Sequence, residues 1–561
     1  MQTAKEVLSS SSKIGIQRKL RNTAVFVRRI VTLSCAKDRE RGQIAPAHVP
    51  FGLVKLRKHR TALALFATLL LAGSLRFYGL EIQSLWNDEL LSWDSANRDT
   101  LYEVTEGLLA VEQEVHPPGY FILLHFIEEY FGESEWVLRF PSAVAGVLSV
   151  LVIYLLGRRL YSPREGLVAA LLLTVLWAPV YYSQEVRMYS LLLLLTMLAT
   201  YFWLSVVRAL NNENRVPIYA MFGYVLSAAV ASYLHYFGLY LIGLQGLWAA
   251  LLFVRRLRAL SYIVLVYALV LLIYLPWLLP VFGRRHQYLA GTSSLGVLIS
   301  PVEIWALSDY LKFIFNQSTA LVIVVLALYL FLLVRGVHVL LKPREHTSIR
   351  SLLLSPSMLL VFWLIVPFAG AYAISVLWKP ALIYRYLIIS LPAAYLLVAR
   401  AITQLPLRPK VQVGLVTVAT GLLLSHLLFS IDYYTEPHKE QFREAVRFAT
   451  LNEGADSLIV GCSWGFYGPD KVPLQDRSAA KFDYYFEQQR SDRRVQVLAC
   501  EAKDMPTLKE HVEREDYRYI LYLTAHNDPE PERPLTLALH DEFELISHEE
   551  LVGANAYLFK V

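Results

Sequence analysis

The sequence contains eleven apolar stretches, each about as long as a helix that crosses a lipid bilayer. The hydrocarbon core of a bilayer needs about 20 predominantly apolar residues in helical form. Hydrophobic residues make up 55% of the chain and charged residues only 18%. This composition is typical of a membrane protein and not of a soluble globular one. The sequence therefore predicts a polytopic α-helical membrane protein. The predicted spans are residues 61–78, 137–157, 165–182, 188–207, 216–232, 236–254, 261–282, 319–341, 357–377, 384–400 and 411–430.

Positive charge in the connections predicts the orientation of these spans. Residues 1–60 carry 14 Lys/Arg against three acids, which is typical of a basic cytosolic extension beside anionic lipid. With the N-terminus in the cytosol, five short connections lie on that side and each contains Lys or Arg, as the positive-inside rule expects. These connections are GRRLYSPRE, RALNNENR, RRLRAL, LKPREHTSIR and ARAITQLPLRPK. The outer segments are then residues 79–136, 181–189, 232–238, 283–318 and everything after 430.

Two outer segments have patterns of their own. GYFILLHFIEEYF (119–131) is apolar but too short to span, and we interpret it as a helix at the membrane interface. Residues 431–561 carry 15 Lys/Arg against 25 Asp/Glu. Here apolar runs (LIVGC, VQVLAC, YILYL, AYLFKV) alternate with amphipathic patterns (QFREAVRFATL, MPTLKEHVERE), which predicts a small extracytoplasmic α/β domain. Residues 61–430 form the predicted transmembrane domain, with 79–136 as its long outer loop.

Three cysteines occur, with no CxxC or Cys/His metal spacing. Cys35 lies in the basic extension, whereas Cys462 and Cys500 lie in the exported region. An oxidising compartment is consistent with one disulfide between Cys462 and Cys500, and two separate thiols are the alternative.

Charged residues are nearly absent from the middle of the spans and collect in the outer loops. Ion-coupled transporters place acids or broken helices near the bilayer midplane. The pattern here favours chemistry at the membrane surface. A lipid-linked oligosaccharide flippase without transfer chemistry is the alternative, followed by a sensor whose outer domain binds a ligand.

The outer loops combine carboxylates with fixed cations beside an apolar groove. This combination suits attack on a sugar carried by a lipid phosphate, because a carboxylate takes the proton of the acceptor hydroxyl and cations stabilise the departing phosphate. A single displacement of this kind inverts the anomeric centre. The residues concerned are Asp88, Glu89, His116, Glu185, Arg187, Arg284, Arg285, Lys379 and Arg385.

Five motifs in order resemble a known family. WNDE, HPPGYFILLH, LRFPSAVAGVLSVLVIYLLGRRLY, YYSQEVRMYSLLLLL and YRYLIISLPAAYLL are similar to those of GT-C polyprenyl-phosphate-sugar glycosyltransferases. That family includes protein O-mannosyltransferases (glycosyltransferase family 39), the lipid A aminoarabinose transferase and lipopolysaccharide galacturonosyltransferases. The resemblance covers roughly residues 60–400. It implies a GT-C fold, a polyprenyl-phosphate-linked sugar donor, and an acceptor glycan, lipid or protein.

The resemblance also implies roles. Asp88, as the acid of the first outer loop, is the expected base, and cations at Arg187 and Arg385 are expected to meet the lipid phosphate together with Lys379. Neighbouring side chains point about 100° apart on a helix. Glu89 is therefore expected to support the site or to orient the acceptor.

The remaining candidates have simpler explanations beside a role in positioning substrate or loops. His116 precedes two prolines that favour extended backbone, Glu185 is placed to pair with Arg187 across a turn, and Arg385 is placed to reach lipid headgroups. Interfacial belts of aromatic residues are common in membrane proteins. That alternative applies to Trp86 and Trp93, which are otherwise expected to stack on a sugar ring. Tyr189 is expected to position substrate or loop, and the weakest candidates are His235 and Arg284.

No motif demands a cofactor. Asp88, Glu89 and Glu185 offer oxygen ligands for a divalent metal, but their spacing matches no metal motif. Nothing in the sequence suggests a nucleic-acid groove. We expect a multi-pass protein of the plasma or inner membrane with a cytosolic N-terminus.

Overall fold

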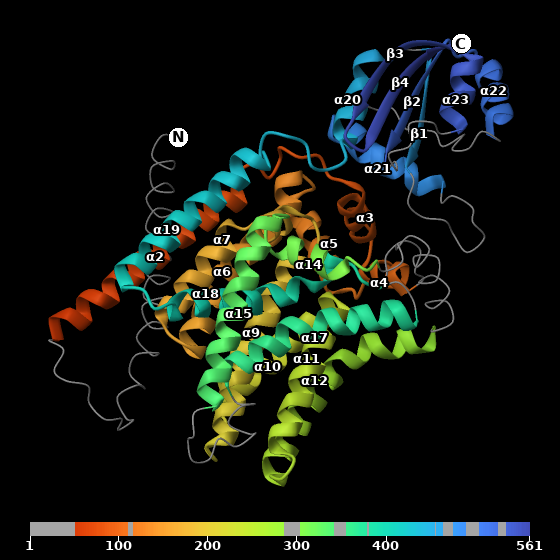
Figure 1. Cartoon of the computed structure of the whole chain (residues 1–561). Coiled ribbons are helices and arrows are strands. Elements are labelled where there is room, and N and C mark those ends of the chain that lie inside the picture. Colours follow the sequence, from red (N-terminus) through yellow and green to blue (C-terminus); the bar gives the residue numbers. More distant parts are fainter. Residues whose placement is uncertain are drawn as a thin grey trace, which may run out of the picture. The chain divides into compact units, whose positions relative to one another are not determined.

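A computed structural model describes residues 51–109, 116–284, 303–341, 355–378, 381–454, 456–463, 475–489, 504–525 and 534–561 (Figure 1). The chain divides into two compact units, Met1–Ala62 and Leu63–Val561. The first unit lies almost entirely outside the described residues, so the predicted extension 1–60 remains an expectation. All contacts given below lie within the second unit.

The membrane part consists of long apolar helices, as predicted. Among the described residues, nine helices are long and apolar enough to cross a membrane. The pair Pro163–Val175 and Trp177–Gln184, bent by 67°, makes a tenth if it is counted as one span. The predicted span 216–232 corresponds to the apolar helix Ile218–Leu234, which is shorter at 17 residues. The predicted class, a polytopic helical membrane protein with a small C-terminal sheet region, is confirmed.

The helices of the membrane part are, in chain order, α2 (Phe51–Phe77), α6 (Glu135–Leu160), α7 (Pro163–Val175), α8 (Trp177–Tyr181), η2 (Tyr182–Gln184), α9 (Tyr189–Asn211), α10 (Ile218–Leu234), α11 (Tyr236–Phe253), α12 (Leu257–Gly283), α15 (Thr319–Leu341), α17 (Pro356–Leu377), η3 (Tyr384–Ser390), α18 (Leu391–Gln404), α19 (Pro409–Ser425) and η4 (His426–Ser430). The loop helices are α3 (Asn87–Ala96), α4 (Leu101–Leu109), α5 (Gly119–Phe131) and α14 (Ala306–Ile314). Helix α5 covers the predicted interfacial segment 119–131. Helix α14 lies in the predicted outer loop 283–318, of which residues 285–302 are outside the described ranges.

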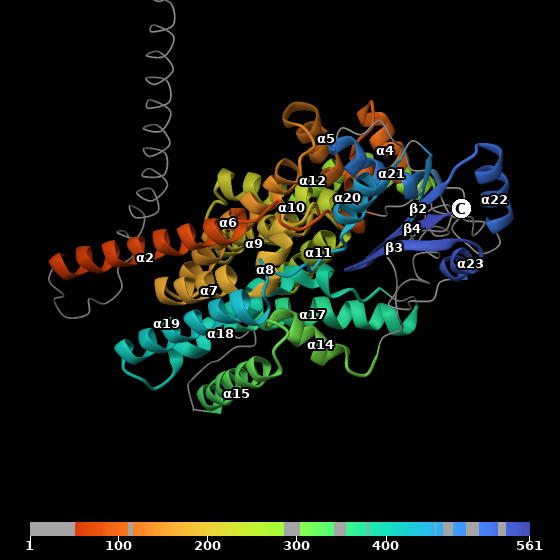
Figure 2. The ribbon, with the colours of Figure 1, turned by 90° about the horizontal axis from the view of Figure 1, so that it is seen from above.

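The predicted span 165–182 is a broken helix (Figure 2). Leu176 has extended backbone (φ −75°, ψ 144°), which ends α7, and α8 begins at Trp177. Backbone groups freed at such a break must find partners where water is scarce. Asn316 supplies one, because its Oδ1 accepts the Trp177 N–H at 2.6 Å. Pro179 disfavours a continuous helix here, because it cannot donate to the carbonyl of Val175, but the partner Asn316 lies 139 residues away and could not be predicted.

Side chains from α2 and from the turn η2 bind carbonyls at helix ends next to this break. The buried Arg76 of α2 donates to the carbonyls of Leu173 and Thr174 at the end of α7, at 2.8 and 3.3 Å. Gln184 in turn donates through Nε2 to the carbonyls of Arg76 and Tyr78 at the end of α2, at 3.1 and 2.7 Å. The last carbonyls of a helix have no partner within it. These hydrogen bonds satisfy carbonyls at the ends of α7 and α2, and they hold the segment that leads into residues 185–188.

Small residues bring α6 and α7 close together. A Cβ on Gly157 would lie 2.6 Å from the Cα of Gly166, closer than real Cβ atoms approach. Glycine at these positions therefore sets the approach of the two helices, as in many membrane helix pairs. Nearer the start of α6, a Cβ on Gly146 would lie 2.1 Å from Oγ of Ser183, so this glycine lets α6 approach the turn η2.

The C-terminal α/β region contains a four-stranded sheet in the order β1-β2-β4-β3. Strands β1 and β2 are parallel, whereas β4 pairs antiparallel with both β2 and β3. The strands are β1 (Ser457–Ser463), β2 (Tyr519–Ala525), β3 (Glu544–Leu551) and β4 (Ala554–Lys560), and the helices are α20 (Phe442–Asn452), α21 (Gln475–Gln488), α22 (Met505–Arg514) and α23 (Pro534–Glu542).

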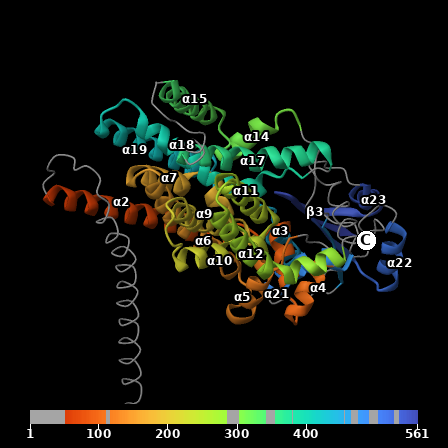
Figure 3. The ribbon, with the colours of Figure 1, turned by 90° about the horizontal axis from the view of Figure 1, so that it is seen from below.

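Alternation along the strands separates two cores. Successive strand side chains point to opposite faces. Leu458 and Val460 face a core with α22 and α23, whereas Ile459 faces a core with α20 and α21. The labelled helices flank the sheet accordingly (Figure 1). Helix α3 of the first outer loop contacts both α5 and α21 (Figure 3).

The strand predictions differ in outcome. Three of the four predicted runs are β1, β2 and β4, and VQVLAC (495–500) lies outside the described residues. Strand β3 was missed because ELISHEEL is an edge strand exposed along most of its length and has no apolar run. Cys462 in β1 is disulfide-bonded, and its partner lies outside the described residues, as does Cys500.

Candidate active site

The candidate site begins at helix α3, which lies within the predicted outer loop 79–136. Its acids Asp88 and Glu89 lie in its first turn, where carboxylates favour the helix dipole. Glu89 also accepts the N–H of Trp86 at 3.4 Å, which is half of a capping box. Leu90 and Trp93 are buried, so the helix has one face against the protein. The local sequence therefore fixes where α3 begins, and with it the two carboxylates.

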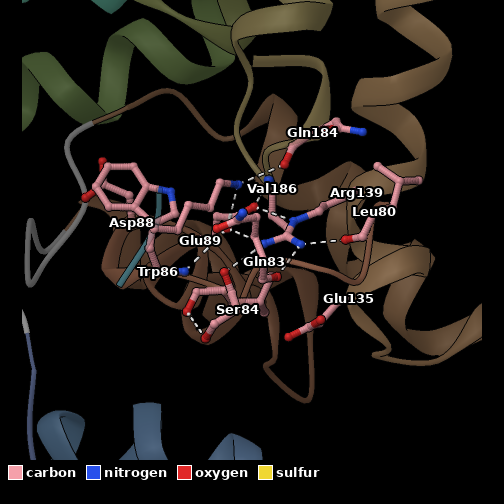
Figure 4. A network of polar contacts seen from close by, with 12 residues as sticks. Leu80, Gln83, Ser84, Trp86, Asp88, Glu89, Glu135, Arg139, Gln184 and Val186 are labelled. Carbon is pink, nitrogen blue, oxygen red and sulfur yellow. Dashed lines mark hydrogen bonds and ion pairs between the residues drawn. The ribbon is translucent and has the colours of Figure 1, made fainter. Parts of the chain in front are cut away.

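Arg139 of α6 is a fully engaged, buried cation beneath this helix (Figure 4). Its Nε and Nη2 donate to the two oxygens of Glu89 at 2.9 and 2.7 Å. Its Nη1 donates to the carbonyls of Leu80 and Gln83, and Nη2 also donates to that of Ser84. All five N–H donors of the guanidinium thus have acceptors. The loop 80–84 is wrapped around this one side chain.

Glu89 is the centre of this network. Besides Arg139, it accepts the backbone N–H of Val186 at 2.8 Å and the Nζ of Lys439 at 3.0 Å. Its side chain has no exposed surface. Burial alone would raise the pKa of Glu89, but the charges of Arg139 and Lys439 and these hydrogen bonds lower it to about 2. Glu89 is therefore an ionised carboxylate whose oxygens are already occupied.

Lys439, from the segment after the last span, completes the cluster. Its Nζ also donates to the carbonyl of Gln184 at 2.9 Å, and its side chain is 2% exposed. Burial and the repulsion of Arg139 lower the pKa of Lys439 to about 8, against the attraction of Glu89 and Glu185. At neutral pH it is still a cation, so it holds the first outer loop to the turn before α9.

Asp88 faces a different cation. Its Oδ2 lies 2.9 Å from Nη2 of Arg385, in the 3₁₀ turn η3 before α18. The side chains are 14% and 27% exposed respectively, unlike the sealed pair below them. The ring of Trp86 lies 5.7 Å from the Arg385 Cζ, within cation–π range. The two neighbouring acids of α3 therefore contact different cations, one buried and one partly accessible.

Arg187 supports α3 from the side of α9. Its Nη1 donates to Ser92 Oγ at 3.0 Å and to the carbonyl of Asp88 at 3.3 Å. The residue is only 2% exposed. Its charge therefore lies next to Asp88, with the guanidinium fastened to the helix backbone.

Glu185 is buried close to this group. It is 0% exposed, and its carboxylate oxygens accept no hydrogen bond from the residues that the structure describes. The predicted pair with Arg187 is therefore not formed. Burial raises the pKa of Glu185 to about 7, with Lys439 opposing the shift and Glu89 adding to it. Glu185 is thus poised to change its charge near neutral pH.

Aromatic rings from four separate segments meet beside Arg385. The rings of His116 and His235 lie 4.6 Å apart, and that of Tyr386 lies 4.5 Å from His235 and 5.5 Å from His116. Tyr189 is 6.3 Å from Tyr386. The structure therefore brings the predicted residues His116, Tyr189 and His235 to one place.

Other predicted residues lie elsewhere. Trp93 donates through Nε1 to Glu133 at 3.1 Å and packs edge-on against Tyr484 of α21. Arg284 forms an ion pair with Glu106 at 2.7 Å. Lys379 and Arg285 fall outside the described residues.

The sequence did not single out several residues that build the site. Arg139 lies near the end of the predicted span 137–157. The C-terminal cations are Lys439, which binds Glu89, Lys481, which binds Asn87, and Arg443, which donates to the carbonyls of Glu81 and Ile82. A signal existed for Arg139, because a charge inside an apolar span needs a partner. For the three C-terminal cations there was none, because polar surfaces contain many such residues. The described residues contain no group of three or more His, Cys, Asp or Glu that could hold a metal ion.

Comparisons with known proteins agree with this architecture. Residues 115–279 match the family model of dolichyl-phosphate-mannose-protein mannosyltransferases. ArnT from Cupriavidus metallidurans in the apo state is similar with a TM-score of 0.50 and 13% identity, over 90% of this chain and 98% of that one. The same protein bound to undecaprenyl phosphate gives 0.48 and 13%, over 91% and 98%.

A more distant likeness is to the oligosaccharyltransferase AglB from Archaeoglobus fulgidus, in complex with an inhibitory peptide and a dolichol-phosphate. Its TM-score is 0.45 at 14% identity, over 89% of this chain and 74% of that one. No curated protein matches the sequence. The likeness to ArnT in the apo state shows the fold, and the predicted resemblance to GT-C glycosyltransferases is confirmed. The chain is a multi-pass membrane protein with the GT-C fold.

Neutralising Glu89 should destabilise the protein strongly. Glu89→Gln leaves Arg139 and Lys439 buried without their carboxylate, and breaking a buried pair in this way costs about 3–5 kcal/mol. We expect a clearly lower thermal midpoint in detergent by a fluorescence melt. Glu103→Gln, at an exposed residue of α4, is the matched control and should melt like the wild type. An unchanged melt for Glu89→Gln would contradict the central role of the cluster.

Glu185 should make stability depend on pH. Its pKa rises from an ordinary value of 4.5 to about 7 on folding, so between these values the unfolded chain releases a proton that the folded protein keeps. Stability is then highest below pH 4.5, falls as pH rises to about 7, and levels off, with a total loss of up to about 3 kcal/mol.

Glu185→Gln should remove this part of the pH dependence. Thermal midpoints of wild type and variant, measured from pH 5 to 8, should move apart as pH rises, with the variant more stable at the alkaline end. Parallel curves would show that the carboxyl is not buried in the folded protein.

Proposed function

We propose that this protein is a glycosyltransferase that moves a sugar from a polyprenyl-phosphate carrier to a hydroxyl acceptor at the extracytoplasmic face. The observation that carries this proposal is the partly exposed pair of Asp88 and Arg385, placed directly above the sealed cluster of Glu89. A carboxylate and a guanidinium that both remain accessible offer a proton acceptor and a phosphate ligand at one point. The GT-C fold supports the same reaction class.

Arg385 is the best candidate for the donor phosphate. A guanidinium binds phosphate with paired N–H donors, and Trp86 restrains its plane. Arg187 is more deeply buried, so in this proposal it adds positive charge from behind α3. Lys379 remains a candidate from sequence alone. The family model matched by residues 115–279 is named for a dolichyl-phosphate-mannose donor, which supports a polyprenyl phosphate here.

Asp88 is the proposed base. The acceptor hydroxyl oxygen attacks the anomeric carbon, and Asp88 takes the hydroxyl proton as the new C–O bond forms. The bond between that carbon and the phosphate oxygen breaks, and its electron pair leaves with the polyprenyl phosphate. Arg385 stabilises the charge that develops there. This single displacement inverts the anomeric centre.

The ion pair of Asp88 and Arg385 gives the reaction an order of events. Arg385 lies 2.9 Å from Oδ2 of Asp88, so the ion pair occupies this oxygen of the proposed base. A donor phosphate would compete for the same guanidinium, and Asp88 would then be free to accept the proton. Binding of the donor thus prepares the base in this proposal.

The other predicted residues have supporting roles in this proposal. His116, Tyr189 and Trp86 line the aromatic surroundings of Arg385 and suit the positioning of sugar or loop. Glu89 is sealed, so we assign it to the positioning of α3 and not to contact with the acceptor. Glu185 is buried beside the cluster and suits a role in setting its charge. The extracytoplasmic location follows from the charge of the predicted cytosolic connections.

Asp88→Asn should abolish most of the transfer. The amide keeps the size of the side chain but accepts no proton, and loss of a general base costs roughly 10²–10⁴-fold in rate. The donor sugar is first identified by mass spectrometry of lipid that copurifies, and transfer is then measured as release of the matching polyprenyl phosphate.

The control for this variant is Asp99→Asn, at an exposed acid shortly after α3, which should leave the rate unchanged. Near-normal transfer by a folded Asp88→Asn protein would remove Asp88 as the base. Binding of lipid without any release by the wild type would point to a flippase.

Arg385→Ala should weaken binding of the donor phosphate. The variant loses the accessible cation, so we expect the Kd for undecaprenyl phosphate to rise at least tenfold, and Arg385→Lys should recover only part of the affinity because it lacks the paired donors. Arg408→Ala, beyond the other end of α18, is the matched control and should bind normally. Equal affinities for Arg385→Ala and the control would contradict the phosphate role.

A further inference from the structure

The C-terminal α/β region contacts the residues on both sides of Asp88. The Tyr485 hydroxyl accepts the N–H of Leu85 at 2.6 Å. Two further contacts meet Asn87, which precedes Asp88, and a fourth meets Glu89, which follows it. Every second residue from 85 to 89 is therefore bound by this region, while the Asp88 carboxylate points to Arg385 of the membrane part.

Two of these contacts hold Asn87. Glu440 accepts its backbone N–H at 2.9 Å, and Lys481 of α21 donates through Nζ to its Oδ1 at 2.6 Å. The first N–H groups of a helix lack partners within it. Contacts to the N–H groups of Leu85 and Asn87 therefore help to define where α3 starts, and with it the direction of Asp88.

Lys439 provides the second kind of contact. It joins Glu89 to the carbonyl of Gln184, so it connects the loop that carries Asp88 with the turn that carries Glu185. Lys439 is 4% exposed and Lys481 is 5% exposed. Lysines are almost never buried unless they are paired, because burial of the ammonium is costly. Two buried lysines that bind the same helical turn therefore indicate a specific interaction with α3 and not a general docking surface.

Helix α3 needs such support. It has ten residues, and isolated helices of this length are marginal in water. Its orientation therefore depends on tertiary contacts. The membrane part supplies those of Arg139 and Arg187, and the α/β region supplies those of Lys439, Lys481 and Tyr485.

We propose that Lys439 and Lys481 are positioning residues for Asp88, so that the active site is complete only when the α/β region holds α3. This inference rests on the proposed function. It assigns the region a part in the reaction geometry in addition to any part in acceptor recognition. Donor phosphate binding is separate, because Arg385 belongs to the turn before α18.

The test uses Lys439→Met and Lys481→Met in the full chain. Methionine keeps the length of the side chain but loses the ammonium, and in Lys439→Met the Glu89–Arg139 pair remains balanced. Lys509→Met is the matched control, because Lys509 pairs with Glu542 at 2.5 Å within the same region and its side chain is 38% exposed.

Three measurements are made on each variant. Amide hydrogen exchange over residues 85–97 should rise in both test variants, while exchange in the membrane helices stays constant. The Kd for undecaprenyl phosphate should stay within twofold of the wild type. The transfer rate with the identified donor should fall about 10- to 100-fold, because small misplacements of reacting groups have effects of that size. Lys509→Met should match the wild type in all three.

The outcomes separate the two proposals. A wild type without transfer would overturn the proposed function, and hydrogen exchange would still report whether the lysines hold α3. If the wild type is active and the lysine variants transfer the sugar at the same rate, only the positioning role would be overturned. Loss of donor binding in the test variants would also overturn it, because the lysines would then act on the whole fold. If a lysine variant fails to fold, Tyr485→Phe is measured instead. A normal melting temperature together with raised hydrogen exchange at Leu85 would then support the role of the α/β region in holding α3.

Discussion

The candidate site of this protein depends on one buried carboxylate, that of Glu89. It joins α3 to Arg139 of α6, to the N–H of Val186 and to Lys439, partners 50, 97 and 350 residues away in the sequence. Burying such charges is favourable only when each finds its partners. Arg139 meets this condition with all five of its donors. The cluster is therefore a single unit, and removal of Glu89 or Arg139 leaves a buried charge without its partner.

This unit gives two adjacent acids different properties. Glu89 has no exposed surface and a pKa lowered to about 2, so its charge is fixed. Asp88 comes from the same helical turn, about 100° away, and its carboxylate is partly exposed beside Arg385. Because Glu89 is held on several sides, the direction of Asp88 is held as well. In the proposed reaction, Glu89 therefore positions the base Asp88 but does not itself contact the substrates.

The sequence predicted what local patterns determine. Apolar runs of about 20 residues predict membrane helices because the bilayer leaves the backbone few alternatives. The break at Leu176 escaped this reasoning, since it is stabilised by Arg76 and Asn316 from distant segments. The acids of α3 were recognisable as a pair. Lys439 could not be recognised, because its role depends on a contact with Glu89, 350 residues away. A single lysine in a polar segment has no distinguishing pattern.

The broken span also explains why Glu185 is unusual. Backbone without regular helix is tolerated near a membrane only where protein encloses it. Arg76, Gln184 and Lys439 provide that enclosure by binding the helix ends and the carbonyls around the break. Glu185 directly follows this segment and is buried as well, and its burial raises its pKa to about 7. Charges interact more strongly where water is excluded. Glu185 also interacts electrostatically with Arg385 and Asp88, so the broken span places a buried carboxyl beside the proposed reaction site.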